Sequence, residues 1–220
     1  MGEITREDLS PSKVSSQPLS DRVYHYLKEA IIKNDIKPRN IIREKDIAAV
    51  FNSSTTPVRE AIKRLAAEGF LEVSPYRYAI VSEPTYKKYQ EICQTLCILD
   101  SFICKQAIKE LSDLDLQKIK EMTLEIERYC SPDTLEEYLE INTNIHITIW
   151  ESLKNEFLYS TIRQVYDKLL HGHRHNVYSE WTRHSSHLKK SLRIHKKLTD
   201  ALIARDTSQI NRIVKNHWKT

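Results

Sequence analysis

The stretch TTPVREAIKRLAAEGF, residues 55–70, carries the start, the body and the end of one helix. Thr55 or Thr56 can cap the start, and Pro57 falls in the first turn, where its missing N–H costs little. Apolar residues then recur at helical spacing, and Gly69 follows them where many helices end on a left-handed residue. The stretch therefore predicts a short amphipathic helix with a defined end.

Patterns on both sides of this helix predict a small domain. Upstream, apolar residues recur at helical spacing over residues 19–34 and predict an amphipathic helix. The segment NIIREKDIAAVF (40–51) predicts an extended piece followed by a second helix. Downstream, FLEVS and YAIVS (70–82) alternate as the two strands of a hairpin. The order helix, helix, turn, helix, hairpin is that of a winged helix-turn-helix domain. We expect this domain over residues 18–82, after a polar tail at residues 1–17.

Polar side chains near the third helix of this domain suit DNA. In a winged helix-turn-helix the third helix lies in the major groove. Its start presents the hydroxyls of Ser54, Thr55 and Thr56 together with backbone N–H groups, which suit phosphates. Arg59 lies one turn further on, where its guanidinium can contact a guanine edge through two hydrogen bonds. Three more cations are expected at the DNA surface: Lys45, Lys63 and Arg77. The alternative is an ordinary helical subdomain with a surface arginine.

The segment FNSSTTPVREAIKRLAAEGFLEVSPYRYAIV (51–81) resembles the recognition helix and wing of GntR-family bacterial transcription regulators. The pattern of that family is approximately (S/T)RTPVREAL-x-RL-x-x-EG(L/F)(L/V), followed by a wing that contains RGA-x-V. The resemblance runs from Leu19 to about Val81 and is most specific in TPVREA and RLxxEG. Thr55 replaces a frequent arginine, and Tyr78 replaces the wing glycine. The resemblance implies a sequence-specific, dimeric DNA-binding regulator, more often a repressor, on a palindromic operator.

The remainder of the chain, residues 83–220, has helical patterns and almost no strand signal. An all-α domain behind such a head resembles the FadR-like subfamily in its FCD-domain form. This resemblance implies a helical bundle that dimerises and binds a small-molecule effector and a divalent metal. The fold class is therefore expected to be mainly α, a winged helix-turn-helix followed by an all-α bundle of about six helices. The expected helices are residues 85–110, 113–129, 132–153, 155–171, 185–204 and 206–218.

Polar residues interrupt the apolar faces of three of these helices. In NTNIHITIW (142–150), Asn142 and His146 fall on the same face as the apolar residues; alone, this pair indicates a hydrogen-bonded core amide and imidazole. His195 and His217 lie in apolar stripes of two other helices. The FCD resemblance implies that all four bind a metal, with NTNIH in place of D-x-x-F-H. Asn142 thus replaces a more frequent carboxylate, and Leu96 replaces an arginine that often pairs with the effector.

Three imidazoles and one oxygen suit Zn²⁺ or Ni²⁺, with open positions for an effector. Two other functions remain open for the C-terminal domain. It could be a metal-dependent hydrolase fused to a DNA-binding head, or a domain that only dimerises. The histidines of HGHRH (171–175) are expected in a polar surface loop, because alternation in a loop fixes no ligand geometry.

Composition argues against several other classes of protein. With only three glycines, the chain has no glycine-rich phosphate loop and no dinucleotide fingerprint, and it is expected not to be an enzyme. No apolar run approaches the length needed to span a membrane, and the N-terminus has no signal-peptide pattern. Four cysteines are interpreted as small buried thiols in a reducing compartment. We therefore expect a cytoplasmic protein that does not associate with membranes.

Overall fold

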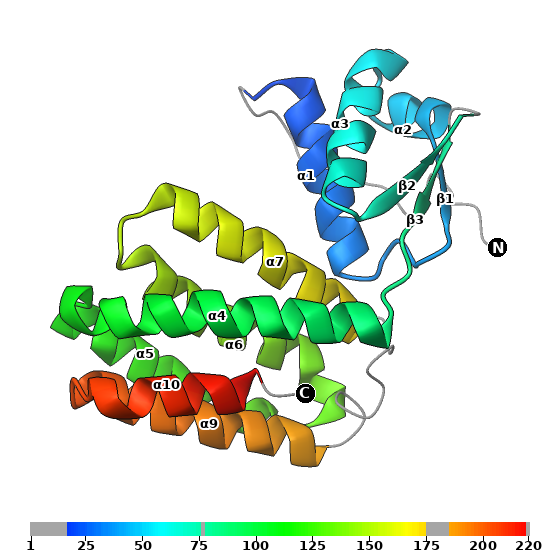
Figure 1. Cartoon of the computed structure of the whole chain (residues 1–220). Coiled ribbons are helices and arrows are strands. Elements are labelled where there is room, and N and C mark those ends of the chain that lie inside the picture. The colour runs from blue at the N-terminus through cyan, green and yellow to red at the C-terminus, as the bar shows by residue number, and fades with distance from the viewer. Residues whose placement is uncertain (1–16, 76–77, 175–184, 219–220) are drawn as a thin grey trace. The chain divides into compact units, whose positions relative to one another are not determined.

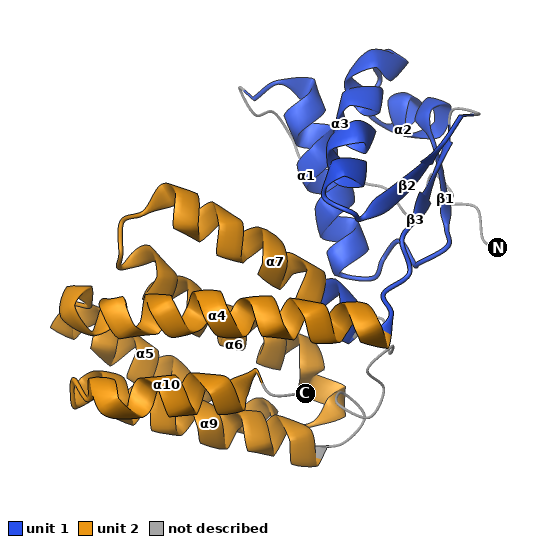
Figure 2. Ribbon diagram, viewed as in Figure 1, with its two compact units in different colours: residues 1–85, 170–175 blue, residues 86–169, 176–220 orange. Residues whose placement is uncertain are grey.

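A computed structural model describes residues 17–75, 78–174 and 185–218 (Figure 1). The chain divides into two compact units, residues 1–85 with 170–175 and residues 86–169 with 176–220 (Figure 2). In the described part of the chain helices predominate, and all strands lie in the first unit. The mainly α fold class is thereby confirmed.

The first unit contains three helices and a three-stranded antiparallel sheet, and it has the order of a winged helix-turn-helix. The short extended piece forms the edge strand, so the sheet order is β1-β3-β2. Ala79 of β3 pairs with Ile42 on one side and with Val73 on the other, which fixes the register of the hairpin. The elements are α1 (Leu19–Ile32), β1 (Ile41–Arg43), α2 (Glu44–Val50), α3 (Thr55–Ala67), β2 (Leu71–Ser74) and β3 (Tyr78–Val81).

Helix α3 begins one residue earlier than the sequence predicts. Ser54 is the N-cap residue, with φ −75° and ψ 165°, and Thr55 is already helical. The prediction of Thr55 or Thr56 as cap is wrong because Pro57 is tolerated anywhere in the first turn, where backbone N–H groups lack helical partners. The predicted end is confirmed: Gly69 has φ +82°. Its N–H donates to the Ala66 carbonyl at 2.9 Å. Residues other than glycine rarely adopt this left-handed backbone conformation.

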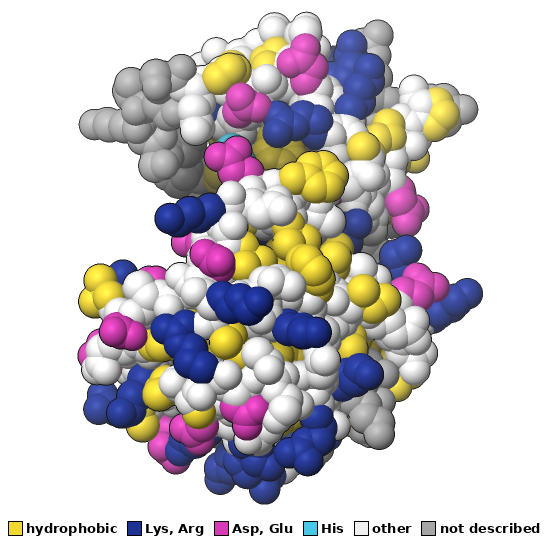
Figure 3. Space-filling view, turned by 60° about the vertical axis from the view of Figure 1, so that its left-hand side comes forward, with side chains coloured by type: hydrophobic (Ala, Val, Ile, Leu, Met, Phe, Trp, Pro, Cys, Tyr) yellow, Lys and Arg dark blue, Asp and Glu magenta, His cyan; other side chains and the backbone are white. Residues whose placement is uncertain are grey.

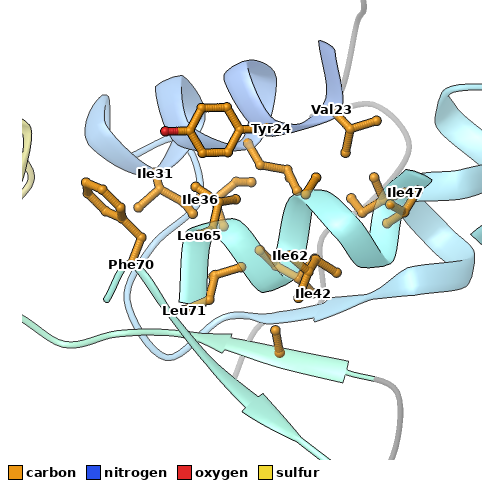
Figure 4. Packing of buried hydrophobic residues seen from close by; sticks show 14 of the residues in the cluster. Val23, Tyr24, Ile31, Ile36, Ile42, Ile47, Ile62, Leu65, Phe70 and Leu71 are labelled. Atoms are coloured by element: carbon orange, nitrogen blue, oxygen red, sulfur yellow. The ribbon is translucent and has the colours of Figure 1, made fainter. Parts of the chain in front are cut away.

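The core of the first unit lies between α1, α3 and the sheet (Figure 4). Leu27 of α1 and Leu65 of α3 are completely buried in it, as is Ile42 of β1. At the edge of this core, the Tyr24 hydroxyl donates a hydrogen bond to Glu68 at 2.6 Å and so links α1 to the residue that follows α3. Burial of these aliphatic side chains provides the main favourable term for folding of the unit, and it fixes the angle at which α3 is presented.

The second unit is helical throughout its described residues. The six expected helices are present, but residues 126–129 and 132–134 form 3₁₀ turns instead of continuing an α-helix. Pro132 explains the interruption, since its ring disfavours helical backbone in the preceding residue. The helices are α4 (Tyr86–Glu110), α5 (Asp113–Glu125), α6 (Leu135–Glu151), α7 (Glu156–Arg174), α9 (Ser185–Ile203) and α10 (Thr207–His217). The last turn of α7, from Leu170 on, belongs to the first unit.

Two of the helix starts carry the caps that the sequence indicates. Ser112 accepts a hydrogen bond from the Asp115 N–H at 3.2 Å, and Asp115 bonds back to the Ser112 N–H, so α5 begins with a capping box. Asp206 accepts a hydrogen bond from the Ser208 N–H at 3.0 Å and caps α10. These caps fix where each helix begins.

The surface seen in Figure 3 carries lysine and arginine side chains interspersed with acidic and uncharged ones. This mixture is typical of solvated helix faces, where charges of both signs keep a chain soluble. Over the described residues, no helix combines the length and the apolar character that a membrane span requires.

Leu65→Ala is expected to lower the free energy of unfolding by about 2–5 kcal/mol, because it leaves a cavity at a fully buried position of α3. Chemical unfolding followed by circular dichroism measures the change. Glu60→Ala, at an exposed position of the same helix, is the control and should alter stability by about 0.5 kcal/mol or less. Equal unfolding midpoints for the two variants would contradict this account of the core.

Candidate functional site

The start of α3 is open to solvent. Ser54 and Thr56 are exposed and Thr55 is half-buried. Among the described residues no side-chain oxygen caps this helix, so its first N–H groups keep their capacity to donate. The positive end of the helix dipole adds to this, and the whole turn suits an anion such as a phosphate.

Arg59 lies one turn into α3 and is held by an acidic residue that sequence reasoning missed. Its Nε donates to Oε1 of Glu44 at 2.9 Å, and its Nη2 donates to Oε2 at 2.7 Å. The Arg59 side chain is 43% exposed, whereas that of Glu44 is 10% exposed. These hydrogen bonds raise the pKa of Arg59. The pair fixes the plane of the guanidinium, because a two-point contact leaves it little rotational freedom.

The other predicted DNA contacts are distributed around this pair. Lys45 follows Glu44 at the start of α2 and is exposed, and Lys63 is exposed one turn beyond Arg59. Arg64, which was not among the predicted contacts, forms an ion pair with Asp21 of α1, and its guanidinium lies 4.0 Å from the centre of the Tyr24 ring. Arg77 lies outside the described residues.

Three of the four predicted metal ligands come together inside the second unit. Nε2 of His146 (α6) lies 3.2 Å from Nε2 of His217 (α10) and 3.3 Å from Nε2 of His195 (α9). One ligand atom from each of the three lies within 4.8 Å of the others. His146 and His195 are buried, and His217 is half-buried. For comparison, a zinc ion with Zn–N bonds of about 2.0 Å places two tetrahedral nitrogen ligands about 3.3 Å apart.

Hydrogen bonding among neutral imidazoles does not account well for this convergence. Nδ1 of His195 lies 3.0 Å from the Ser191 carbonyl and must donate to it, so Nε2 of His195 carries a lone pair. If His146 carries its hydrogen on Nε2, that one hydrogen is shared between two acceptors. If it does not, the two lone pairs of His146 and His195 face each other. A cation between the three nitrogens removes the conflict, because each then directs a lone pair to it.

Burial keeps the imidazoles of His146 and His195 neutral. Desolvation lowers the pKa of His146 well below its usual value, and the neighbouring His195 lowers it further. Desolvation also lowers the pKa of His195, to about 4, against a smaller opposite effect of the hydrogen bond to Ser191. Neutral imidazole is the form that binds metals, so the site is prepared for a divalent ion at neutral pH.

Asn142, the fourth predicted ligand, lies one helical turn before His146 and is 8% exposed. Its Nδ2 donates to the Tyr166 hydroxyl at 2.8 Å. Its Oδ1 is buried and makes no hydrogen bond among the described residues. A buried amide oxygen without a donor is costly, and its lone pairs suit a metal or a metal-bound water.

Aromatic side chains surround the histidine cluster, and a buried carboxylate lies behind them. The rings of Trp150, Tyr166 and Trp218 have their centres 5.3, 5.6 and 5.4 Å from that of His146. Asp100 of α4, completely buried, has Oδ2 3.9 Å from Nδ1 of His146. Sequence reasoning missed Asp100; a lone acidic residue in the apolar stripe of α4 was the available signal.

The expected surface loop at HGHRH is partly wrong. Helix α7 continues through Arg174, and both His171 and His173 are buried, at 5% and 4% exposure. The apolar pattern before them simply runs on, which the alternation of histidines obscured. His175 lies outside the described residues.

Family models match both parts of the chain. Residues 19–78 match the model described as bacterial regulatory proteins, gntR family, and residues 91–220 match the FCD domain. The chain belongs to the GntR family, with a C-terminal FCD domain. The expected resemblance is confirmed.

Curated relatives of this GntR/FCD chain are transcription regulators. The transcriptional repressor RspR of Escherichia coli K12 is 22% identical over 154 residues, covering 68% of this chain and 66% of RspR. The gluconate operon transcriptional repressor of Bacillus subtilis 168 is 34% identical over 122 residues, covering 54% of this chain and 50% of the repressor. The chain thus spans about two thirds of the length of one relative and half of the other.

Solved structures share the fold. McbR/YncC of E. coli has a TM-score of 0.77 at 22% identity, with 92% of this chain and 94% of that chain covered. A GntR regulator from Rhodococcus sp. RHA1 has a TM-score of 0.64 at 20% identity, covering 90% and 93% of the two chains. The chain therefore shares with these solved structures the fold of a winged head followed by a helical domain.

Proposed function

We propose that this GntR-family chain is a sequence-specific, DNA-binding transcription regulator that represses from a palindromic operator in the cytoplasm. The observation that carries the proposal is the start of α3. There, exposed hydroxyls, uncapped N–H groups and the Arg59 guanidinium lie within two turns of one another. This combination suits a helix that enters the major groove with its N-terminus first. Two relatives are named as repressors, which supports repression rather than activation by this chain.

The pairing of Arg59 with Glu44 suits the reading of a guanine. Glu44 accepts from Nε and Nη2 along one side of the guanidinium. The outer hydrogens on Nη1 and Nη2 remain, and these form the fork that matches O6 and N7 of guanine. Ser54, Thr55, Thr56, Lys45, Lys63 and Arg77 are proposed to contact the DNA backbone.

The FCD domain, residues 83–220, is proposed to bind a divalent metal, Zn²⁺ or Ni²⁺, through Asn142, His146, His195 and His217. Support comes from the nitrogen spacing, the conflict of lone pairs and the buried Oδ1 of Asn142. The metal would supply open coordination positions, to which a small-molecule effector binds and so alters operator affinity. We assign no catalytic residue, because the family relatives are regulators.

The protein is proposed to act as a homodimer, so that two copies of α3 meet two half-sites. Helix α4 carries Ile98 and Phe102, four residues apart on one face and exposed at 73% and 55%. Large apolar side chains that share an exposed face suit contact with a second copy.

Arg59→Ala is expected to weaken binding by about 1–3 kcal/mol to duplexes that the wild-type protein selects from a randomised library, and to relax preference at one base pair. Fluorescence anisotropy on selected and random duplexes measures both effects. Lys63→Ala is the matched comparison and should weaken binding to both kinds of duplex alike, since a phosphate contact carries no sequence information. Equal loss on both duplexes for Arg59→Ala would overturn its role in base recognition.

Protein purified without chelators is expected to bind one Zn²⁺ or Ni²⁺ per chain, seen by elemental analysis and by a change in tryptophan fluorescence, because Trp150 and Trp218 contact His146. His195→Gln should abolish this binding. His25→Gln, at an exposed position of α1, is the control and should bind as the wild type does. A wild-type protein that binds neither ion would leave dimerisation as the role of the FCD domain.

Phe102→Lys is expected to convert the dimer largely to monomer at micromolar concentration, because a buried, unpaired ammonium in an interface is costly. Sedimentation velocity measures the association state. Leu124→Lys changes an equally exposed side chain on α5, 57% exposed, and should leave the dimer intact. A dimer in both variants would place the interface away from this face of α4.

A further inference from the structure

Asp100 is a buried carboxyl group that no lysine or arginine of the described residues pairs with. It is completely buried in α4, and its carboxylate accepts three hydrogen bonds. Oδ1 accepts from Nε1 of Trp150 at 2.8 Å and from Sγ of Cys104 at 3.5 Å, and Oδ2 accepts from Nε1 of Trp218 at 2.8 Å. Within the described residues, no lysine or arginine forms an ion pair with it, and the side chain near it that can carry a positive charge is that of His146.

In this buried environment the ionised form of Asp100 is costly unless a positive charge lies nearby. A carboxylate taken out of water loses far more free energy than neutral indole and thiol donors return. Burial raises the pKa of Asp100, and the hydrogen bonds that Trp150, Trp218 and Cys104 donate to its carboxylate oppose this shift only in part. Burying an ionised Asp100 would therefore lower the stability of the domain strongly unless another group offset the desolvation.

The partners of Asp100 lead directly to the histidine cluster. Trp150 lies one helical turn after His146 on α6, and Trp218 follows His217 at the end of α10. One carboxylate thus ties α4 to both of the helices that supply these two imidazoles. Its hydrogen bonds fix the ends of α6 and α10 relative to each other.

A second contact points to the metal. Nδ1 of His146 is buried and makes no hydrogen bond among the described residues, and Oδ2 of Asp100 is 3.9 Å away. When Nε2 of His146 binds a metal, its hydrogen is on Nδ1 and needs an acceptor. Carboxylates commonly fill that place behind metal-binding histidines, where they hold the ring and increase its basicity.

The proposed donor set contains no anion. It consists of three neutral imidazoles and the neutral amide of Asn142. We propose that Asp100 supplies the missing negative charge from outside the coordination sphere, and that it positions His146 through Nδ1. The inference rests on the proposed metal function: the ion and the buried carboxylate stabilise each other, and neither is well accommodated alone.

Asp100→Asn tests the proposal, with Zn²⁺ alone as the probe and a chromophoric chelator as competitor. We expect the full-length variant to bind Zn²⁺ about 10- to 100-fold more weakly than the wild type. Asn142→Asp should restore most of this loss in the Asp100→Asn background, because it returns a carboxylate to the site. Thr123→Val, which removes the buried hydroxyl bond to Thr199, is the control for a disturbed core and should bind Zn²⁺ normally.

Nuclear magnetic resonance of the wild-type, zinc-loaded protein gives a readout that does not depend on how the variant folds. A strongly deshielded, exchange-protected Nδ1–H signal of His146 is expected in this wild-type spectrum. If wild-type protein binds no Zn²⁺ or Ni²⁺, the metal function itself fails. If it binds zinc but the Nδ1–H signal is absent, or Asp100→Asn keeps wild-type affinity, the role of Asp100 is overturned while the metal site stands.

Discussion

The second unit brings three imidazoles together, with Nε2 of His146 lying 3.2 Å from Nε2 of His217 and 3.3 Å from Nε2 of His195. Neutral imidazoles at these distances either share one hydrogen between two acceptors or direct two lone pairs at each other, so hydrogen bonds within the cluster cannot satisfy all three nitrogens. Three helices nevertheless direct them to one point, with aromatic rings excluding water around them. The packing of α6, α9 and α10 is therefore what the proposed metal would require, and the buried Asp100 behind His146 fits the same proposal.

Helix ends set the precision of both sites. In the first unit, the left-handed turn at Gly69 ends α3 and redirects the chain into β2, so the opposite end of the helix is free at the surface. In the second unit, Asp206 fixes the start of α10, and His217 is thereby placed about three turns later. Local capping chemistry, worth about 1 kcal/mol at each end, decides where a functional side chain arrives.

Much of this could be predicted from sequence because its signals are local. Helical periodicity, Ser112, Asp206 and Gly69 each act within a few residues, and the resulting helices agree with the structure to within a few positions. The convergence of His146, His195 and His217 was accessible only through family resemblance, since periodicity places a residue on a face but does not say which faces meet.

The residues that sequence reasoning missed are defined by partners far along the chain. Glu44 is meaningful only beside Arg59, and Asp100 only beside Trp218, 118 positions away. The burial of His171 and His173 was missed for a different reason. Alternating histidines suggest a loop, but no helix-ending residue pattern precedes them, and α7 continues through Arg174. Tertiary contacts of this kind have no counterpart in a local pattern.

The ion pair between Arg59 and Glu44 separates two properties that DNA-binding surfaces usually combine. Because the carboxylate neutralises the guanidinium, Arg59 adds little to the long-range field that attracts the polyanion and releases counterions. If Arg59 contacts a guanine as proposed, its remaining donors would discriminate between base edges at contact distance. The charge that attracts DNA and the group that distinguishes one sequence from another would then reside on different side chains, so ionic strength would tune the first with little effect on the second.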